Sequence, residues 1–478
     1  MLARLIAFSL TQRLLVLVLA ALLIGAGSFA FLQLPIDAFP DVSTTQVKII
    51  IKAPGMTPEE VETRITVPIE QEMLGIPRQR ILRAVSKYAL TDVTIDFDDG
   101  TDIYWARQQV AERLAGVMKD LPAQASGGLA PITTPLGEMF MFTIEGPLSL
   151  EEKRSLLDWT IRPQLRTLRG VADVNSLGGH ARSFEVTPDP AALNARGVTL
   201  GELKQALEAN NRNDGSGRIS EGEETLLVRV EGAIRSLDEL RAVVVATKNG
   251  ALVRIGDVAK VGIGSLTRYG AVTKDGQGEA VEGLVLGLRG ANAQAVVGAV
   301  RARLAEIEAL LPPGTKIVTL YDRGDLVERA VGTVSKALLE AIVLVVVLLL
   351  AFLGNLRAAL VVATILPLSA LATFILMNAF GLSANLMSLG GLAIAIGMLV
   401  DAAVVIIENV EASLSQPGAA RKLPLLHVIY RAVREVAAPV ASGIAIIVIV
   451  FVPLLTLEGL EGKLFTPVAL TIVFALSA

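Results

Sequence analysis

Residues 387–409 read MSLGGLAIAIGMLVDAAVVIIEN and place two carboxylates in an otherwise uncharged, helix-length stretch. A charge at the centre of a membrane helix costs about 2.5–3.5 kcal/mol even on the gentler scales, so intramembrane acids mark functional sites. Asp401 and Glu408 are seven residues apart, which puts both on one helix face, about 10 Å apart along the axis. Gly390 and Gly397 lie on nearly the same stripe, where small residues let a neighbouring helix approach closely.

This pattern predicts a proton relay. A carboxyl group held in hydrocarbon has its charged form disfavoured, so it can take up and release a proton near neutral pH. For Asp401 the alternative is a buried hydrogen-bonding residue that does not titrate. For Glu408, near the helix end beside Asn409, a structural role at the membrane interface fits the sequence as well as a relay role does.

Apolar segments on both sides of this stretch predict six membrane spans. The chain is 52% hydrophobic and 19% charged, with a mean hydropathy of +0.57, which is too apolar for a soluble multidomain enzyme. A helix crosses the hydrocarbon layer in about 20 residues. The expected segments are residues 14–36, 337–356, 358–400 (one span and most of a second), 436–457 and 464–478. The last one ends with the chain, so we expect a fragment cut within span six.

The first apolar segment and the loop charges fix the expected orientation. A signal peptide is the alternative for residues 14–36, but 23 uncharged residues exceed the usual apolar core of about 7–15. Arg4 and Arg13 precede this span, Arg357 lies between spans two and three, and further basic residues lie between spans four and five. Basic residues of short loops stay on the cytoplasmic side. The sequence therefore predicts a cytoplasmic N-terminus and a periplasmic insert at residues 37–335.

The insert contains two copies of one pattern of elements. Strand, helix, strand, strand and helix follow one another, which is typical of the ferredoxin-like arrangement. In the first copy a strand is expected at residues 46–51, a helix at 57–74, a strand at 89–97 and the second helix at 102–119. In the second copy they are expected at residues 138–144, 149–168, 171–177, 184–188 and 200–210. A β-rich lobe is expected to follow as an insertion, before residues 284–288, 291–311 and 316–320 complete the second copy.

Composition excludes several other functions. The chain has no cysteine and two histidines, so thiolate sites and a multi-histidine zinc site are excluded. A net charge of −4 lacks the basic footprint of a nucleic-acid binder. No phosphate-binding or dinucleotide-binding glycine motif occurs, so we expect neither an enzyme nor a cofactor.

Two groups in the insert are weak candidates for binding metal cations. Glu138, Met139 and Met141 lie on one expected strand, where core packing of the methionines is favoured over ligation. Asp96, Asp98 and Asp99 end another strand, and a solvated strand end is favoured over a cation site there.

Four further motifs, together with the segment around Asp401, resemble those of the resistance-nodulation-division (RND) efflux transporters, specifically their heavy-metal-efflux branch. The motifs are PIDAFP at 35–40, LVRIGDVA at 252–259, YDR at 321–323 and FLGNLR at 352–357. The drug-exporting branch usually carries two adjacent aspartates in span four, whereas Ala402 follows Asp401 here, as in the metal branch.

The resemblance implies a polytopic α-helical membrane protein that works as a homotrimer in the bacterial inner membrane. It implies a first span within residues 1–36, a first porter subdomain at 37–135, a second at 136–335 with a docking lobe at about 183–267, and spans two to six at 336–478. Such pumps use proton entry to export heavy-metal cations from the periplasm or cytoplasm through a periplasmic adaptor protein and an outer-membrane channel. They have twelve spans in two halves, so this chain resembles the first half, and most metal ligands would lie in the second.

Three alternatives remain at this stage. An RND exporter of hydrophobic, drug-like compounds and a lipid- or sterol-handling member of the superfamily would both keep the duplicated extramembrane units. An intramembrane aspartyl protease would need a second aspartate in another span, and Asp401 is the only aspartate in any expected span.

Overall fold

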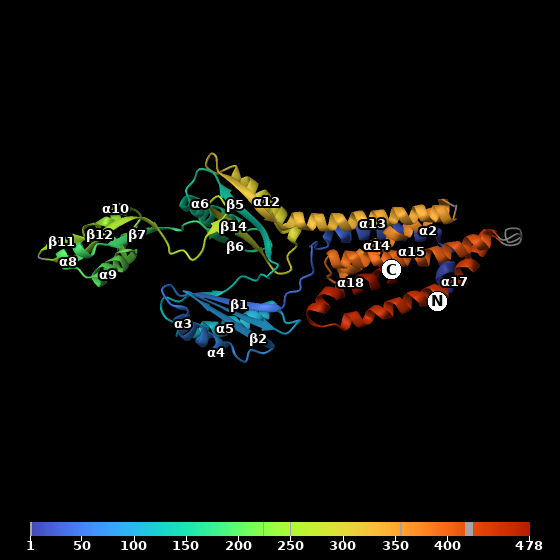
Figure 1. Ribbon diagram of the computed structural model, residues 1–478, viewed down its shortest axis with the longest axis horizontal. Helices are drawn as coiled ribbons and strands as arrows, with labels where there is room; N and C mark the ends of the chain where they lie inside the picture. The colour runs from blue at the N-terminus through green and yellow to red at the C-terminus, as the bar shows by residue number, and fades with distance from the viewer. Residues whose placement is uncertain (1, 223, 249, 354–355, 416–423) are drawn as a thin grey trace.

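The computed structural model describes residues 2–222, 224–248, 250–353, 356–415 and 424–478. The molecule is elongated (Figure 1), with a bundle of apolar helices at one end, two α+β units in the middle and a smaller lobe at the other end. The bundle thus contains both chain termini, while the α+β part is one continuous excursion from it.

Five helices of the described chain are long and apolar enough to cross a membrane. They are α2 (Arg13–Gln33), α14 (Leu356–Ala379), α15 (Leu386–Ser415), α17 (Leu425–Phe451, extended by the 3₁₀ turn η3, Val452–Thr456) and α18 (Gly459–Ser477). A short helix, α1 (Leu2–Thr11), precedes α2. The expected break within residues 358–400 is confirmed, because α14 ends at Ala379 and α15 begins at Leu386.

The segment expected as span two lies in α13 (Arg323–Leu353), a 31-residue helix that runs from the α+β units into the bundle beside α14. It is not among those five helices, and several of its side chains and residues 354–355 lie outside the described part of the chain.

The first α+β unit is ferredoxin-like, as expected. Its sheet has the order β2-β3-β1-β4, formed by β1 (Thr45–Lys52), β2 (Gln79–Lys87), β3 (Leu90–Phe97) and β4 (Ser126–Leu129). Alternate residues of β1 are buried, which is the period-two pattern of a sheet covered on one face. The covering helices are α3 (Pro58–Val61), the π turn η1 (Glu62–Thr66), α4 (Val67–Met73) and α5 (Ile103–Val117).

The second unit repeats this topology with an interruption. Its sheet has the order β13-β14-β5-β15, and β6 pairs with β14. The strands are β5 (Glu138–Glu145), β6 (Val171–Gly178), β13 (Val272–Thr273), β14 (Glu279–Gly287) and β15 (Lys316–Asp322). The helices are α6 (Leu150–Leu156), the π turn η2 (Leu157–Ile161), α7 (Arg162–Arg166) and α12 (Ala293–Glu308).

Two elements that the sequence assigned to the second unit belong to the lobe instead, so that assignment was wrong. The strand at 184–188 lies in β7 (Arg182–Pro188), which pairs along its whole length with β12 (Ala259–Ser265). The helix at 200–210 is α9 (Leu200–Asn210), whose Leu203 packs in the lobe core with Leu240 and Val253. The third strand and second helix of the unit are β14 and α12, which come after the insertion: β14 lies between β5 and β6 in the sheet, and α12 packs into the same core as η2 and α7.

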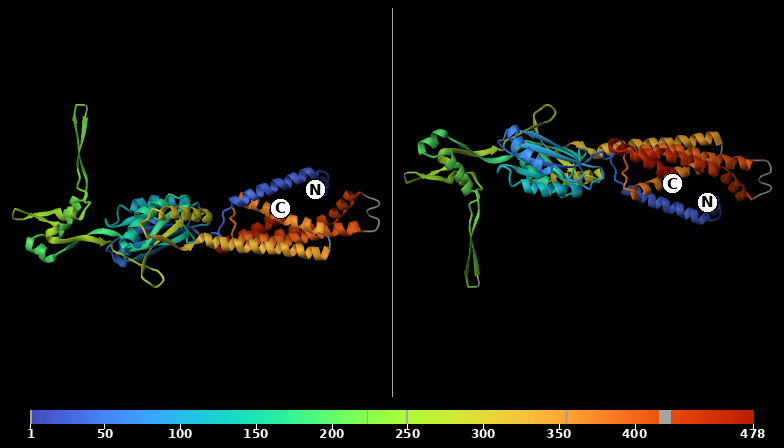
Figure 2. Two further views of the ribbon diagram at one scale, coloured as in Figure 1. Left: turned by 90° about the horizontal axis from the view of Figure 1, so that it is seen from above. Right: turned by 90° about the horizontal axis from the view of Figure 1, so that it is seen from below.

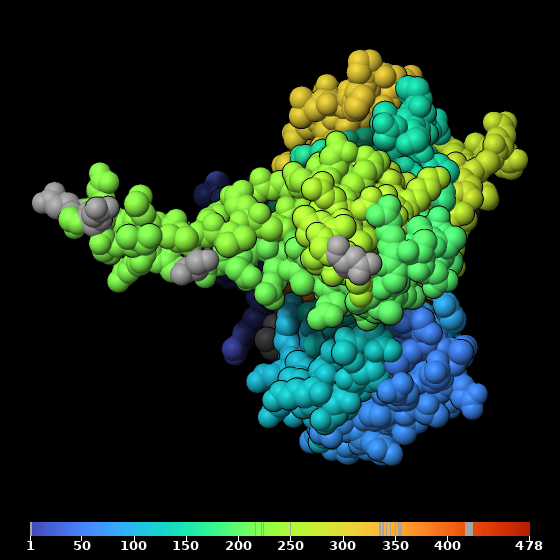
Figure 3. All heavy atoms as spheres, turned by 90° about the vertical axis from the view of Figure 1, so that its left-hand side faces the viewer, coloured from blue at the N-terminus to red at the C-terminus, as the bar shows by residue number. Residues whose placement is uncertain are grey.

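The lobe is mixed rather than β-rich. Besides β7, β12 and α9 it contains α8 (Pro190–Arg196), α10 (Leu237–Ala242), α11 (Ile255–Val258), β10 (Val244–Lys248) and β11 (Ala251–Arg254). A hairpin of β8 (Asp214–Glu221) and β9 (Glu224–Val230) reaches far from the lobe (Figure 2), and every residue of β9 is exposed. Seen from the lobe end, the hairpin projects beyond all other atoms on its side (Figure 3).

Candidate functional site

Asp401 and Glu408 lie on the same face of α15, and both are exposed in the described chain. The opposite face of α15 is packed: Leu392, Ala395 and Ile396 are buried in a cluster with residues of α14 and α18. The exposed stripe therefore runs along a helix that is otherwise held within the bundle. It contains Gly397 as well as the two carboxylates.

The glycines of this helix differ in what they contact. A Cβ added at Gly390 or Gly397 would meet no described atom within 4 Å. At Gly391 a Cβ would lie 2.8 Å from the backbone oxygen of Val468, so this glycine permits the close approach of α18. The approach of a neighbouring helix at Gly390 and Gly397 stays a prediction, whereas Gly391 is a packing residue that the sequence reasoning missed.

Two polar contacts also help to hold the helices around α15. The Asn409 side-chain amide donates to the carbonyl of Ala432, at 2.8 Å, and ties α15 to α17. The Ser369 hydroxyl donates to the carbonyl of Ala475, at 3.1 Å, and ties α14 to α18. Polar side chains that satisfy backbone groups of a neighbouring helix are worth about 0.6–2 kcal/mol in a bilayer.

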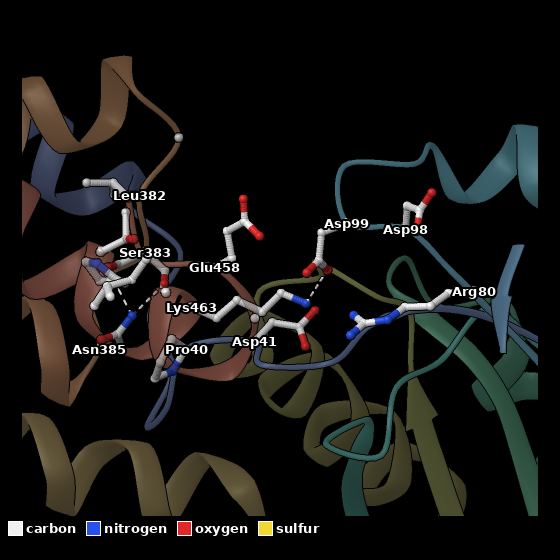
Figure 4. Close-up of a pocket in the computed structure, with 16 residues that line it drawn as sticks. Pro40, Asp41, Arg80, Asp98, Asp99, Leu382, Ser383, Asn385, Glu458 and Lys463 are labelled. Atoms are coloured by element: carbon white, nitrogen blue, oxygen red, sulfur yellow. Dashed lines mark hydrogen bonds and ion pairs between the residues drawn. The ribbon is translucent and has the colours of Figure 1, made fainter. Parts of the chain in front are cut away.

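A hollow of about 1060 Å³ separates the bundle from the first α+β unit (Figure 4). Its walls carry the carboxylates Asp41, Asp98, Asp99 and Glu458 together with the basic residues Arg80 and Lys463. The ammonium group of Lys463, on α18, reaches across and lies 2.7 Å from the Asp99 carboxylate.

The strand end beside this hollow is only partly solvated. Asp98 and Asp99 are exposed, as the sequence indicated. Asp96 is 5% exposed, so its expected place at a solvated strand end was wrong. Its carboxylate accepts from Arg83 at 2.6 Å and from the Thr44 hydroxyl at 3.0 Å, which compensates the cost of burying a charge.

The weak metal candidates do not converge on one site. Met139 is 4% exposed and packs in the core of the second unit against Gly287, Met141 is half-buried, and Glu138 is exposed. Burial first, and then the negative charge of Glu138, raises the pKa of Glu282. Within the described residues, no three of the His, Asp and Glu side chains are grouped so that they could hold a metal ion.

Comparison with known proteins adds to this geometry. A family model described as the AcrB/AcrD/AcrF family matches residues 5–478. The chain belongs to this family. Its members are RND permeases, which are multi-pass proteins of the inner membrane and transporters rather than enzymes.

Similar relatives include proteins named for metal resistance or for cation efflux. The chain is 42% identical over 491 residues to the cobalt-zinc-cadmium resistance protein CzcA of Cupriavidus metallidurans, covering 100% of this chain and 46% of the relative. It is 39% identical over 479 residues to the cation efflux system protein CusA of Escherichia coli K12, covering 98% and 46%. A crystal structure of a heavy metal efflux pump matches with a TM-score of 0.90 at 34% identity, covering 99% of this chain and 46% of that one. The chain thus spans about half the length of the relatives it matches.

Proposed function

We propose that this chain is part of an inner-membrane transporter that exchanges protons for heavy-metal cations and exports them. The observation that carries the proposal is the exposed stripe of α15, where Asp401 and Glu408 lie within an apolar helix long enough to span a membrane. The chain that contains this helix is similar to a cobalt-zinc-cadmium resistance protein. Asp401 is the proposed proton carrier and Glu408 the second relay group. Gly390 and Gly397 are proposed to admit a further helix along the same stripe.

The proposed chemistry needs no cofactor. Taking up a proton changes the cost of keeping a carboxyl group in the membrane by a few kcal/mol. A change of that size is enough to shift a two-state protein between conformations that differ in substrate access. Proton entry would therefore drive the α+β units, here proposed as porter subdomains at about residues 37–135 and 136–335, through their transport cycle.

The proposed assembly is a homotrimer with its N-terminus in the cytoplasm and residues 37–335 in the periplasm. An adaptor protein and an outer-membrane channel would complete the export path, with the lobe at about 183–267 as the docking subdomain. The exposed β8–β9 hairpin supports assembly, because a two-stranded ribbon is only marginally stable alone and this one exposes Leu226, Leu227 and Val230. Contact with another subunit would bury those side chains.

The test replaces Asp401 with Asn in the full-length transporter. The Asp401→Asn variant keeps the size and hydrogen-bonding capacity of the side chain but removes the titratable proton. We expect normal insertion and assembly with loss of proton-driven export and of resistance to cobalt, zinc and cadmium. Glu408→Gln is expected to lose less, since its position near the helix end gives access to water.

Two outcomes would contradict the proposal. Full metal resistance in Asp401→Asn at normal expression would return Asp401 to a structural role. Export of an organic compound or a lipid, without any of the metals, from proteoliposomes that hold the full-length protein would retain the transporter and replace its substrate class.

A further inference from the structure

The segment between α2 and β1, residues 34–44, is here termed the linker, and it is hydrogen-bonded to the start of α15. Ile36 and Ala384 form an isolated parallel bridge, in which the Asp37 amide donates to the Ala384 carbonyl at 3.1 Å. The amide of Leu386, the first residue of α15, donates to the Ala38 carbonyl at 3.2 Å. Ala38 is 1% exposed, so this contact is shielded from water. The linker therefore follows the N-terminal end of the helix that carries Asp401.

A buried ion pair joins the linker to α13 and to the second unit. Arg323, the first residue of α13, donates to the Asp37 carboxylate at 2.8, 2.9 and 3.1 Å, and also to the carbonyl of Leu136. Arg323 is 6% exposed. The preceding residue, Asp322, pairs at 2.6 Å with Arg301 on α12. The two motifs at 35–40 and 321–323 thus meet in space and connect the bundle to the second unit.

The other end of the linker is held by two basic side chains. Arg289, which precedes α12, donates to the carbonyls of Ser43 and Thr44 at 3.3 and 3.4 Å and pairs with Asp41 at 3.4 Å. Lys463, on α18, donates to the same Ser43 carbonyl at 3.0 Å and to Asp99 of the first unit. Figure 4 shows this lysine extending from the bundle toward the first unit.

We propose that the linker is the coupling element of the transporter: residues 34–44 carry displacements of α15 and α18 to both α+β units through Asp37–Arg323 and through Lys463. Asp37, Arg323 and Lys463 are positioning residues in this scheme, since none of them lies on the stripe that holds Asp401. The inference rests on the proposed function, because it describes how protonation of Asp401 would move the α+β units.

The geometry makes the path short and stiff. Leu386 and Asp401 are fifteen residues apart on one helix, about 22 Å along the axis, so a tilt or shift at the carboxylate moves the hydrogen-bonded linker. Gly391 brings α18 against α15 five residues after the helix begins, so Lys463 moves with the same pair of helices. From the linker, Arg323 and Arg289 act on the second unit, while Lys463 acts on the first.

The test measures whether the α+β units still respond to the proton site. In the full-length protein, Glu59→Cys on α3 and Ala302→Cys on α12 supply the label sites for double electron–electron resonance; this chain contributes no other thiol. Asp401→Asn, which mimics the protonated state, is expected to shift the distance between the labels. Adding Asp37→Asn or Lys463→Gln to Asp401→Asn is expected to abolish that shift, whereas adding Lys463→Arg preserves it. With Asp401 intact, Asp37→Asn or Lys463→Gln is expected to lower metal export at least tenfold, and Lys463→Arg is expected to retain export.

Lys204→Gln is the matched control, because Lys204 pairs only with Glu208 among the described residues, on the exposed face of α9. Lys463 lies at the rim of the hollow, so Lys463→Gln keeps the test valid if Asp37→Asn fails to fold. If the distance between the labels still shifts fully when Asp37→Asn or Lys463→Gln is added to Asp401→Asn, the coupling proposal is overturned and the proposed proton site stands. Absence of any shift and of any export defect in Asp401→Asn alone would instead overturn the proposed function.

Discussion

Substituting Gly27 by Ala tests the packing of the first apolar helix, which leads directly into the linker. A Cβ at Gly27 would lie 2.6 Å from the Cβ and 2.9 Å from the carbonyl oxygen of Leu371 on α14. Carbon atoms pack at about 3.5–4.0 Å, so α2 and α14 would have to separate by roughly 1 Å. Gly25, two residues earlier on α2, would place its Cβ within 4 Å of no described atom and provides the matched control.

The expected magnitude follows from comparing the two variants. Both gain the preference of Ala over Gly in a helix, about 1 kcal/mol, and this gain cancels in the difference. Only Gly27→Ala adds the cost of overpacking, about 1–3 kcal/mol. We therefore expect Gly27→Ala to be less stable than Gly25→Ala by that amount, about 5- to 150-fold in the folded-to-unfolded ratio.

The assay is thermal inactivation in detergent, followed as the fraction of protein that stays monodisperse on size exclusion after heating. Gly27→Ala should show a lower midpoint than Gly25→Ala, and Gly25→Ala a midpoint equal to or above that of the unmodified protein. Coinciding midpoints for the two variants would refute the close approach of α2 and α14 as a determinant of stability.

Three further predictions address the α+β part. Glu202 accepts hydrogen bonds first from the Thr199 backbone and then from Lys248, and its pKa is lowered to about 2. Because the unfolded value is about 4.3, the α9 cap should hold above that pH and be lost as pH falls toward 2. The loss should appear as falling protection of the first α9 amides relative to their intrinsic exchange rates, and this fall should be absent in Glu202→Gln. Phe142 is 0% exposed, so Phe142→Ala should destabilise the second unit by about 3–5 kcal/mol in denaturant titrations, and a loss below 1 kcal/mol would contradict its core position. Thr225→Cys, at the hairpin, should react with an impermeant maleimide in intact spheroplasts, whereas labelling only after permeabilisation would reverse the proposed orientation.

The sequence predicted those features that depend on local patterns. Uncharged runs identified the apolar helices, and the helices expected from residues 57 and 149 do start there, each with a capping box, at Thr57–Glu60 and Ser149–Glu152. The π turns η1 and η2 were not predicted. Each ends two residues before a proline, Pro68 or Pro163, whose missing amide and bulky ring disturb regular helical hydrogen bonding.

Long-range pairing was the part that local patterns could not supply. The lobe interrupts the second unit after two of its four principal strands, and nothing in the composition of β7 or α9 marks them as belonging to the insertion. The burial of Asp96 depends on Arg83 from a neighbouring strand. Asp401 and Glu408 were placed on one face from their spacing alone, because a single helix fixes that relation.

The pairing of Asp37 with Arg323 also has a consequence for biosynthesis, because the two residues are 286 positions apart in the chain. At about 5–20 residues per second, roughly 15–60 s pass between synthesis of the aspartate and synthesis of its partner. During that interval synthesis of the first ferredoxin-like unit is completed, while Asp37, in the linker between α2 and that unit, still lacks its partner. The Asp37–Arg323 ion pair therefore forms late. It should slow the unfolding of the finished protein without accelerating the folding of the first ferredoxin-like unit.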